Sequence, residues 1–318
     1  MTSKRTVKTI RKERTLSEQD RQWHLWVDKP AGKPHASGAV IRLNSTYLEL
    51  VDGNYQGRGA MSAWGLFAAG LFAYGIVAIF VSAVRRIYLD GGQEIEDRFS
   101  FLVNTTLFLG FEVLCVLGVC LYNRSIGEWF SYTHYPIRLN RKNRMVYVFR
   151  GDGTVLEAPW DEIYFTLHEA KKVAGTTWLG ISGLVLKDPQ TVQEQFMFGF
   201  SEVSADDCRN HWEFIRRYME DGPQAVMHAD GMKFCLPIAD KKETPYQGWV
   251  ELLSSMGTYT ILRVTLMPFF ALFWVGRMFA NATCKVPLWP ADVEASCRIE
   301  PGDMYVRDSS KNPEKEYR

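Results

Sequence analysis

The sequence contains none of the motifs that commonly mark a catalytic or metal-binding site. Its six cysteines never stand in C-x-x-C spacing, which argues against a zinc site or a thioredoxin-type redox centre. It has no H-E-x-x-H pair, no glycine-rich loop followed by Lys and Ser or Thr, and no G-x-S-x-G nucleophile elbow. We therefore expect no catalytic residue, no metal and no cofactor, and a protein that is not an enzyme.

Positive and negative charges are nearly balanced as well, with a formal net charge of +1. No nucleic-acid partner is therefore expected. The basic N-terminus is not followed by the apolar core of a signal peptide, so we expect targeting to depend on the first apolar helix.

The sequence does have long apolar runs. Residues 61–84 carry no charge over 24 positions, and a helix needs only about 20 residues to cross a bilayer core. Residues 101–122 form a second run, which is interrupted by Glu112 near its middle. A carboxylate at that depth costs about 2.5–3.5 kcal/mol, and the apolar neighbours outweigh this cost. The two runs predict a transmembrane helical hairpin.

A third apolar segment, residues 255–281, permits two interpretations. As one helix it is long enough to cross a membrane, although Arg263 divides it and Pro268 lies in its second half. The shorter piece 264–276 would instead be re-entrant or interfacial.

Lys and Arg residues are concentrated outside the predicted hairpin tip. Eleven precede the first run, three lie between the runs among four acidic residues, and five follow soon after the second run. The positive-inside rule then places the N-terminus and residues 123–250 in the cytoplasm. Membrane lipids are the partners that this arrangement implies.

Beyond the hairpin, apolar residues alternate with polar ones and turn-forming residues separate the segments. A helix at 204–220 follows, with Ser204 as its cap and with Trp212 and Ile215 on its apolar face. A β-hairpin at 38–51 precedes the first apolar run and is expected to complete the same sheet. The strands expected from the alternation are 137–140, 145–149, 155–158, 163–168, 178–186 and 195–200.

The expected fold class is an α+β membrane protein. A transmembrane helical hairpin and a third C-terminal apolar helix hold a β-rich cytoplasmic domain that one helix caps. The division along the chain is a basic N-terminal arm (1–37), a β-hairpin joining the soluble domain (38–60), the transmembrane hairpin (61–122), the β-rich domain with its C-terminal helix (123–222), a linker (223–254), a third membrane segment (255–281) and a polar tail (282–318).

Two stretches of the β-rich domain carry a resemblance. The segment 136–149, with its basic turn between two strands, and the later Trp160-Asp161-Glu162-Ile163 element resemble bacterial pleckstrin-homology-like domains attached to membrane hairpins. The resemblance covers about residues 134–220. It implies a small barrel or curled sheet with the helix closing one end.

The layout of the whole chain is similar to an uncharacterised bacterial membrane family, domain of unknown function 6708. Its members are associated with type VI secretion loci, where small membrane proteins often act as immunity partners. The resemblance implies a multi-pass protein of the bacterial inner membrane that neutralises a cognate secreted toxin by direct binding. It provides no catalytic residue to carry over.

An alternative function rests on two ionisable residues in apolar surroundings. Glu112 and Arg263 would lie about 15 and 12 Å deep at 1.5 Å per residue if their helices run side by side, and they could pair. The protein would then be a membrane sensor or a transport component. Three helices are too few for a monomeric carrier, so transport would require a homo-oligomer. Snorkelling of Arg263 and protonation of Glu112 are the simpler explanation.

Two smaller features are candidate sites. A basic cluster, which follows the second apolar run by 16–22 residues, could bind lipid headgroups or a partner, or could be a solvated turn; it comprises Arg138, Arg141, Lys142 and Arg144. Cys284 and Cys297 could form a disulfide if the tail is extracytoplasmic, and otherwise are unpaired thiols.

The histidines offer little for chemistry. His211 and Asp207 are four residues apart on the predicted helix, and we interpret them as a surface pair because no third ligand accompanies them. His168 lies in a predicted strand.

Overall fold

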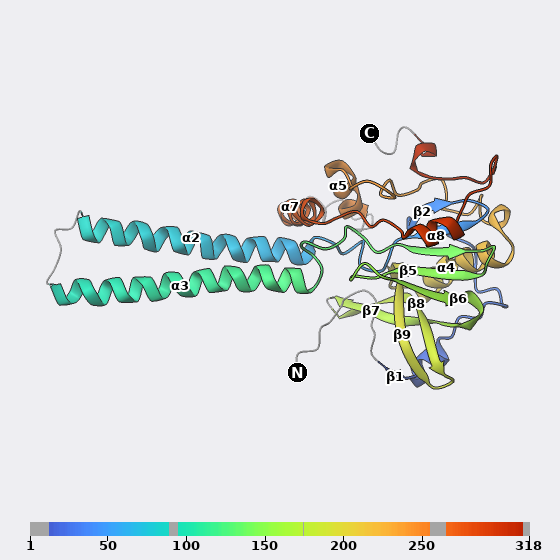
Figure 1. Cartoon of the computed structure of the whole chain (residues 1–318), viewed down its shortest axis with the longest axis horizontal. Coiled ribbons are helices and arrows are strands. Elements are labelled where there is room, and N and C mark those ends of the chain that lie inside the picture. Colours follow the sequence, from blue (N-terminus) through green and yellow to red (C-terminus); the bar gives the residue numbers. More distant parts are fainter. Residues whose placement is uncertain (1–12, 89–94, 174, 255–264, 314–318) are drawn as a thin grey trace.

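The computed structural model describes residues 13–88, 95–173, 175–254 and 265–313. A long helical hairpin projects from a body that contains two antiparallel sheets (Figure 1).

The hairpin consists of α2 (Ala60–Tyr88) and α3 (Ile95–Ser125). Within it, Ala60–Arg85 and Ser100–Ser125 are each long and apolar enough to cross a membrane, and only 6% of each is buried by the rest of the protein. At 1.5 Å per residue each stretch is about 39 Å long, which exceeds the ~30 Å hydrocarbon core. Large apolar side chains point outward along both helices, among them Leu71, Tyr74, Phe80, Leu107, Phe111 and Leu114. The two predicted apolar helices are confirmed.

The first sheet has the strand order β2-β3-β4-β5-β6. Its strands are β2 (Val40–Leu43), β3 (Tyr47–Leu50), β4 (Ile137–Asn140), β5 (Met145–Phe149) and β6 (Val155–Pro159). β3 pairs with β4 from Tyr47 opposite Asn140 to Leu50 opposite Ile137. The helical hairpin is therefore an insertion between two adjacent strands. Residues 38–51 pair with the strands that follow the helical hairpin, as predicted, but those later strands form two sheets rather than the single sheet that was expected.

The second sheet has the order β1-β9-β8-β7. Its strands are β1 (Arg14–Thr15), β7 (Ile163–Val173), β8 (Thr176–Asp188) and β9 (Thr191–Glu202). The last three are longer than predicted, because the alternation fades at their exposed ends while the backbone pairing continues.

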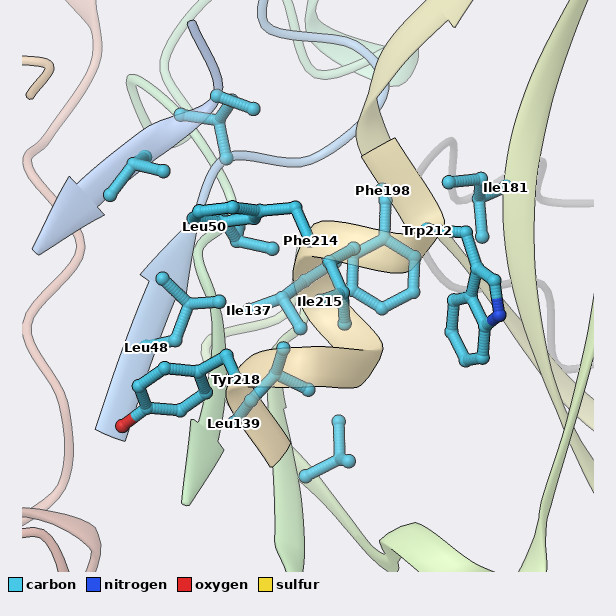
Figure 2. Packing of buried hydrophobic residues seen from close by; sticks show 14 of the residues in the cluster. Leu48, Leu50, Ile137, Leu139, Ile181, Phe198, Trp212, Phe214, Ile215 and Tyr218 are labelled. Atoms are coloured by element: carbon cyan, nitrogen blue, oxygen red, sulfur yellow. The ribbon is translucent and has the colours of Figure 1, made fainter. Parts of the chain in front are cut away.

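Helix α4 (Ala205–Glu220) lies between the two sheets (Figure 2). The Ser204 hydroxyl accepts a hydrogen bond from the N–H of Asp207 at 3.3 Å, so the helix begins where its sequence predicts. Trp212 and Ile215 are fully buried, as expected from the apolar face. In Figure 2, Leu48, Leu50, Ile137 and Leu139 approach the helix from one sheet, and Ile181 and Phe198 approach it from the other. α4 thus joins the sheets through one apolar core.

The predicted N-terminal arm and linker are not loose segments where the structure describes them. In the arm, Leu16, Leu25 and Ala36 are buried, and α1 (Glu18–Gln22) is held by a capping box between Ser17 and Asp20. Two short 3-10 helices follow in this part of the chain, η1 (Trp160–Glu162) and η2 (Pro223–Ala225). The stretch after η2 contributes buried side chains to the main core: Val226, Met232, Cys235, Leu236 and Ile238. These apolar residues lack a regular period, which is why the sequence pattern did not reveal them.

The C-terminal part contains α5 (Pro245–Ser254), α7 (Met267–Thr283), α8 (Ala291–Ser296) and the 3-10 helix η3 (Ser309–Lys311). After α7 the chain returns to the body, where the N–H of Thr133 donates to the carbonyl of Lys285 at 2.8 Å. Further along, the N–H of Leu43 donates to the carbonyl of Arg307 at 2.8 Å. The polar tail therefore covers the first sheet.

Of residues 255–281, the structure describes 265–281, most of which belong to α7. α7 packs across the first turns of α2, and Figure 1 shows it nearly end-on at the base of the hairpin. Residues 255–264 lie outside the described residues, so the choice between a spanning and an interfacial segment stays a prediction. Arg263 lies outside the described residues.

Candidate functional site

The base of the hairpin is held by a buried arginine, Arg277 of α7, which is 1% exposed. Its Nε and one terminal nitrogen each donate to the carboxylate of Glu243 at 2.7 Å. Its other terminal nitrogen donates to the carbonyls of Tyr55, Gln56 and Arg58 in the loop before α2, at 3.2–3.4 Å. We call this arrangement the joint, because it ties α7 to the start of the hairpin.

The charges of the joint are stabilised by one another. Burial alone would lower the pKa of Arg277, but the carboxylate of Glu243 raises it above the usual range. Burial raises the pKa of Tyr55 well above its usual value, and its hydroxyl donates to Glu243 at 3.0 Å. Burial also raises the pKa of Glu251 on α5, against the opposing charge of Arg277. The joint is therefore a buried network of ion pairs and hydrogen bonds, and its contacts hold this part of the structure together.

A second polar network ties the end of α3 to the start of α2. The Glu128 carboxylate accepts from the N–H of Gly59 at 3.1 Å and from the Ser62 hydroxyl at 2.8 Å. Trp129 donates its indole N–H to the same hydroxyl at 2.9 Å. Glu128, which follows α3, thus caps the N-terminus of α2, where the helix dipole favours a negative charge.

A cavity of about 270 Å³ lies beside this network. Its lining comes from the loop before α2, the turn after α3 and the neighbouring ends of β7 and β9: Gly53, Asn54, Gln56, Gly57, Arg58, Met61, Ile126, Gly127, Glu128, Ala170, Lys171 and Ser201. Because Ala170 and Lys171 of β7 line this cavity, the end of β7 lies beside the base of the hairpin.

Arg138, the first member of the predicted basic cluster, is fully buried and cannot reach a lipid headgroup. Its guanidinium lies over the rings of Tyr47 at 4.3 Å and Trp289 at 4.8 Å, and it donates to Glu49 and Glu294 at 3.2 Å each. The prediction is wrong for this residue because its partners come from distant parts of the chain. Arg138 attaches the tail to the first sheet.

The other members of the basic cluster remain partly or fully exposed. Lys142 pairs with Glu300 of the tail, and Arg144 pairs with Asp161 at 2.5 Å and Glu220 at 3.0 Å. The guanidinium of Arg141 lies close to Gly222. The structure therefore brings this turn to the tail and the end of α4, and a headgroup role for these three residues stays a prediction.

The tail and the first sheet enclose a second cavity of about 250 Å³. Arg42, Tyr47, Ile299 and Arg307 are among its lining residues. Ile299 is 42% exposed, and the nearby Met304 is 79% exposed. We call Ile299, Met304 and the cavity beside them the tail face. It includes methionine, tyrosine and arginine side chains, which are enriched at protein interfaces.

Glu112 faces α2 within the hairpin. A Cβ on Gly75 would lie 3.1 Å from a carboxylate oxygen of Glu112, so the glycine provides the room for the carboxyl group. Asn123 approaches Gly65 in the same way. One oxygen of Glu112 is buried without a hydrogen-bond partner among the described residues. Because Arg263 lies outside those residues, the predicted pair stays a prediction.

The disulfide predicted between Cys284 and Cys297 is not formed, since both thiols are free. The sulfur of Cys284 accepts from Arg58 at 2.8 Å and lies 3.3 Å from the carbonyl of Glu128. The sulfur of Cys297 accepts from Asn140 at 3.4 Å. Cys284 therefore makes its contacts at the base of the hairpin, and Cys297 makes its contact at the C-terminal end of α8.

His211 is buried rather than exposed, so its interpretation as a surface pair with Asp207 is wrong. Its ring packs against Phe200 and Phe214, and its Nδ1 lies 3.2 Å from the carbonyl of His35. His168 hydrogen-bonds Ser182 at 2.9 Å. Among the described residues, no group of three or more His, Cys, Asp or Glu side chains could hold a metal ion.

Sequence reasoning missed the joint. Arg277 stands inside an apolar helix and Glu243 in a polar stretch 34 residues earlier, so no local pattern links them. The single charge in a run of apolar residues was the available signal, because such a charge requires a partner when it is buried.

Comparison with known proteins gives one family match. The model of the family described as "Family of unknown function (DUF6708)" matches residues 113–301, which is more than half of the chain. No curated protein and no solved structure matches the sequence or fold.

Proposed function

The chain belongs to the DUF6708 family, and we propose that it is a membrane-anchored immunity protein that neutralises a cognate secreted toxin by binding. The hairpin would be the anchor in the bacterial inner membrane, with the body on the cytoplasmic side. The type VI secretion context comes from the resemblance of the chain's layout, and it belongs to this proposal.

One observation carries the anchoring part of the proposal. Both helices of the hairpin present apolar side chains around their exposed circumference, and a helix that is hydrophobic all round requires an apolar environment. The joint fixes the base of the hairpin to the body through the buried pair of Arg277 and Glu243. A body so attached would be held in one orientation at the membrane surface.

The body itself supports binding. Two antiparallel sheets packed on the helix that follows their last strand support the interpretation as a pleckstrin-homology-like domain, which forms part of the proposal. The tail face is the surface where we place the toxin, because Met304 and Ile299 are exposed beside a cavity that Arg42 and Arg307 line. A few such apolar and arginine residues usually provide most of the binding energy at an interface.

The experiment co-expresses the full-length protein with the toxin candidate encoded beside it and scores both survival and co-purification in detergent. We expect Met304→Asp and Ile299→Asp to abolish both. Val203→Asp is the matched control, because Val203 is 46% exposed and lies outside the tail face, and it should keep both. His168→Ala and His211→Ala should keep protection wherever they keep the complex.

Two results would contradict the proposal. Absence of protection by the wild-type protein would remove immunity, and loss of protection in a histidine variant that still binds the toxin would point to chemistry rather than binding.

The second candidate is a membrane sensor or an oligomeric transport component. The buried, unpartnered oxygen of Glu112 favours it, because ionisable groups inside membranes commonly serve proton or ion pathways. Glu112→Gln separates the two candidates. Immunity by the tail face should tolerate this change, whereas a sensor or carrier should lose its response.

A further inference from the structure

Helix α7 has an apolar surface that the protein covers only in part. From Met267 to Gly276 it carries no charged side chain, and its one arginine, Arg277, is buried in the joint. Met267, Phe269 and Val275 are 41%, 55% and 48% exposed. A helix on the surface of a water-soluble body would present polar side chains outward. α7 presents phenylalanine, methionine and valine.

The direction of α7 differs from that of the hairpin. Its middle crosses the first turns of α2, where Phe273 packs on Trp64 with ring centroids 6.4 Å apart. Figure 1 shows α2 along its length and α7 nearly end-on. If α2 crosses a bilayer, α7 therefore extends along the membrane surface rather than through it.

Three tryptophan side chains lie near the crossing of α7 and α2. Trp274 of α7 packs edge-on against Trp249 of α5 at 6.0 Å and donates its indole N–H to the carbonyl of Pro245 at 2.8 Å. Trp64 lies in the second turn of α2 and is 52% exposed. We call these three side chains the tryptophan belt. Tryptophan is enriched at membrane–water interfaces, where its apolar ring and its polar N–H are both accommodated.

The end of the β7–β8 hairpin reaches this level independently. Lys171 lines the cavity at the hairpin base together with Met61, in the first turn of α2, and Ile126, the residue that follows α3. Its ammonium lies 4.4 Å from the ring centre of Trp178. A lysine beside a tryptophan at this position suits the headgroup region, where the cation meets phosphates and the ring meets acyl chains.

We propose that α7 lies in the headgroup region of the lipid leaflet that faces the body, with Met267, Phe269 and Val275 inserted and the tryptophan belt at the membrane–water boundary. This inference rests on the proposed membrane anchoring. It assigns the base of the body to a lipid surface, and so leaves the tail face for a protein partner. Amphipathic and apolar helices of this kind bind at the boundary between headgroups and acyl chains.

The test places a fluorescent probe at Phe269 in the full-length protein. Phe269→Cys is made together with Cys115→Ala and Cys120→Ala, since the remaining four cysteines are buried. The labelled protein is reconstituted in phosphatidylethanolamine–phosphatidylglycerol liposomes that contain a nitroxide either on the headgroup or deep on the acyl chain. Leu107→Cys on α3 is the deep control, and Met304→Cys on the tail is the aqueous control. Val275→Cys is a second probe on α7.

We expect the probes at 269 and 275 to lose more fluorescence with the headgroup nitroxide than with the deep one. The probe at 107 should show the reverse, and the probe at 304 should respond to neither. If 107 is quenched from the deep position while 269 and 275 respond to neither nitroxide, α7 lies in water: the inference fails and the anchoring stands. Stronger quenching of 269 and 275 by the deep nitroxide also overturns the inference. If 107 itself is unquenched, the anchoring proposal fails and the inference with it.

Discussion

Gly276 of α7 and Gly59, the residue before α2, lie backbone against backbone. A Cβ on Gly276 would stand 2.5 Å from the carbonyl oxygen of Gly59, closer than real Cβ contacts. Gly59 itself has a φ of +91°, a conformation that side chains disfavour. The close crossing of α7 over α2 therefore depends on two glycines. The buried ion pair of the joint lies directly beside them, because Arg277 follows Gly276 in α7.

The first prediction follows from this crossing. Gly276→Ala should destabilise the protein by about 1–3 kcal/mol or more, because the clash is with backbone that cannot rotate away. The measurement is thermal unfolding in detergent. Gly118→Ala is the control, since nothing lies within 4 Å of a Cβ at that position of α3. Equal melting temperatures for both variants would show that the helices do not cross so closely.

The second prediction concerns the joint. Arg277→Ala should cost about 3–5 kcal/mol, because it leaves the Glu243 carboxylate buried without its partner. Replacing both residues by leucine should recover part of this loss. The solvent-exposed pair of Arg209 and Asp206 provides the control, and Arg209→Ala should leave the melting temperature unchanged. A loss in the double variant that equals the sum of two single losses would argue against a direct pair.

The third prediction concerns the core between the sheets. Trp212 is fully buried and lies 4.6 Å from Phe165 and 5.6 Å from Trp160, measured between ring centroids. Trp212→Ala should therefore cost about 3–5 kcal/mol as a large-to-small core change. Trp26→Ala serves as the comparison, because Trp26 is 51% exposed. Wild-type stability of the Trp212 variant would mean that α4 does not join the sheets.

The fourth prediction is a loss of stability in mild acid. Burial lowers the pKa of His211 from 6.5 to about 4 and has the same effect on His168. Between these pH values the unfolded chain binds protons that the folded chain does not, so stability is complete above pH 6.5 and declines as the pH falls toward 4. The melting temperature in detergent should follow this course. His211→Phe, beside Phe200 and Phe214, should flatten the decline; an unchanged slope would exclude His211 as a cause.

The fifth prediction is the orientation in the membrane. Cysteine introduced at Gly91, between the two long helices, should react with an impermeant thiol reagent in intact cells, whereas cysteine at Gly151 should react only after lysis. The basis is the excess of Lys and Arg outside the hairpin tip. The reverse labelling pattern would place the body outside the cytoplasm and remove its access to a toxin there.

The sequence predicted best those elements whose signal is local. The apolar runs gave α2 and α3, and Ser204 marked the start of α4. The alternation around Asn44 and Ser45 identified the strand pair β2–β3, and the shared period of two suggested that it belongs with β4.

The sequence failed where a side chain's partner is distant along the chain. Arg138 stands beside the turn residues 141–144 in the sequence and was grouped with them. Its carboxylate partners Glu49 and Glu294 are 89 and 156 residues away. Burial of an arginine depends on such partners, and a pattern of basic residues alone cannot show them. The same limit explains why Arg277 and Glu243 were missed.

The position of the hairpin between β3 and β4 also sets an order of events during synthesis. β3 leaves the ribosome first, and its partner strand follows only after both long helices have been made. If those helices enter a bilayer, the sheet can close only when α3 has brought the chain back to the side where β3 waits. If only one of the two helices crossed, β3 and β4 would lie on opposite sides of the membrane, and β3 would keep an open edge that invites aggregation or proteolysis. For an anchored protein, closure of the first sheet would therefore require both helices to be inserted.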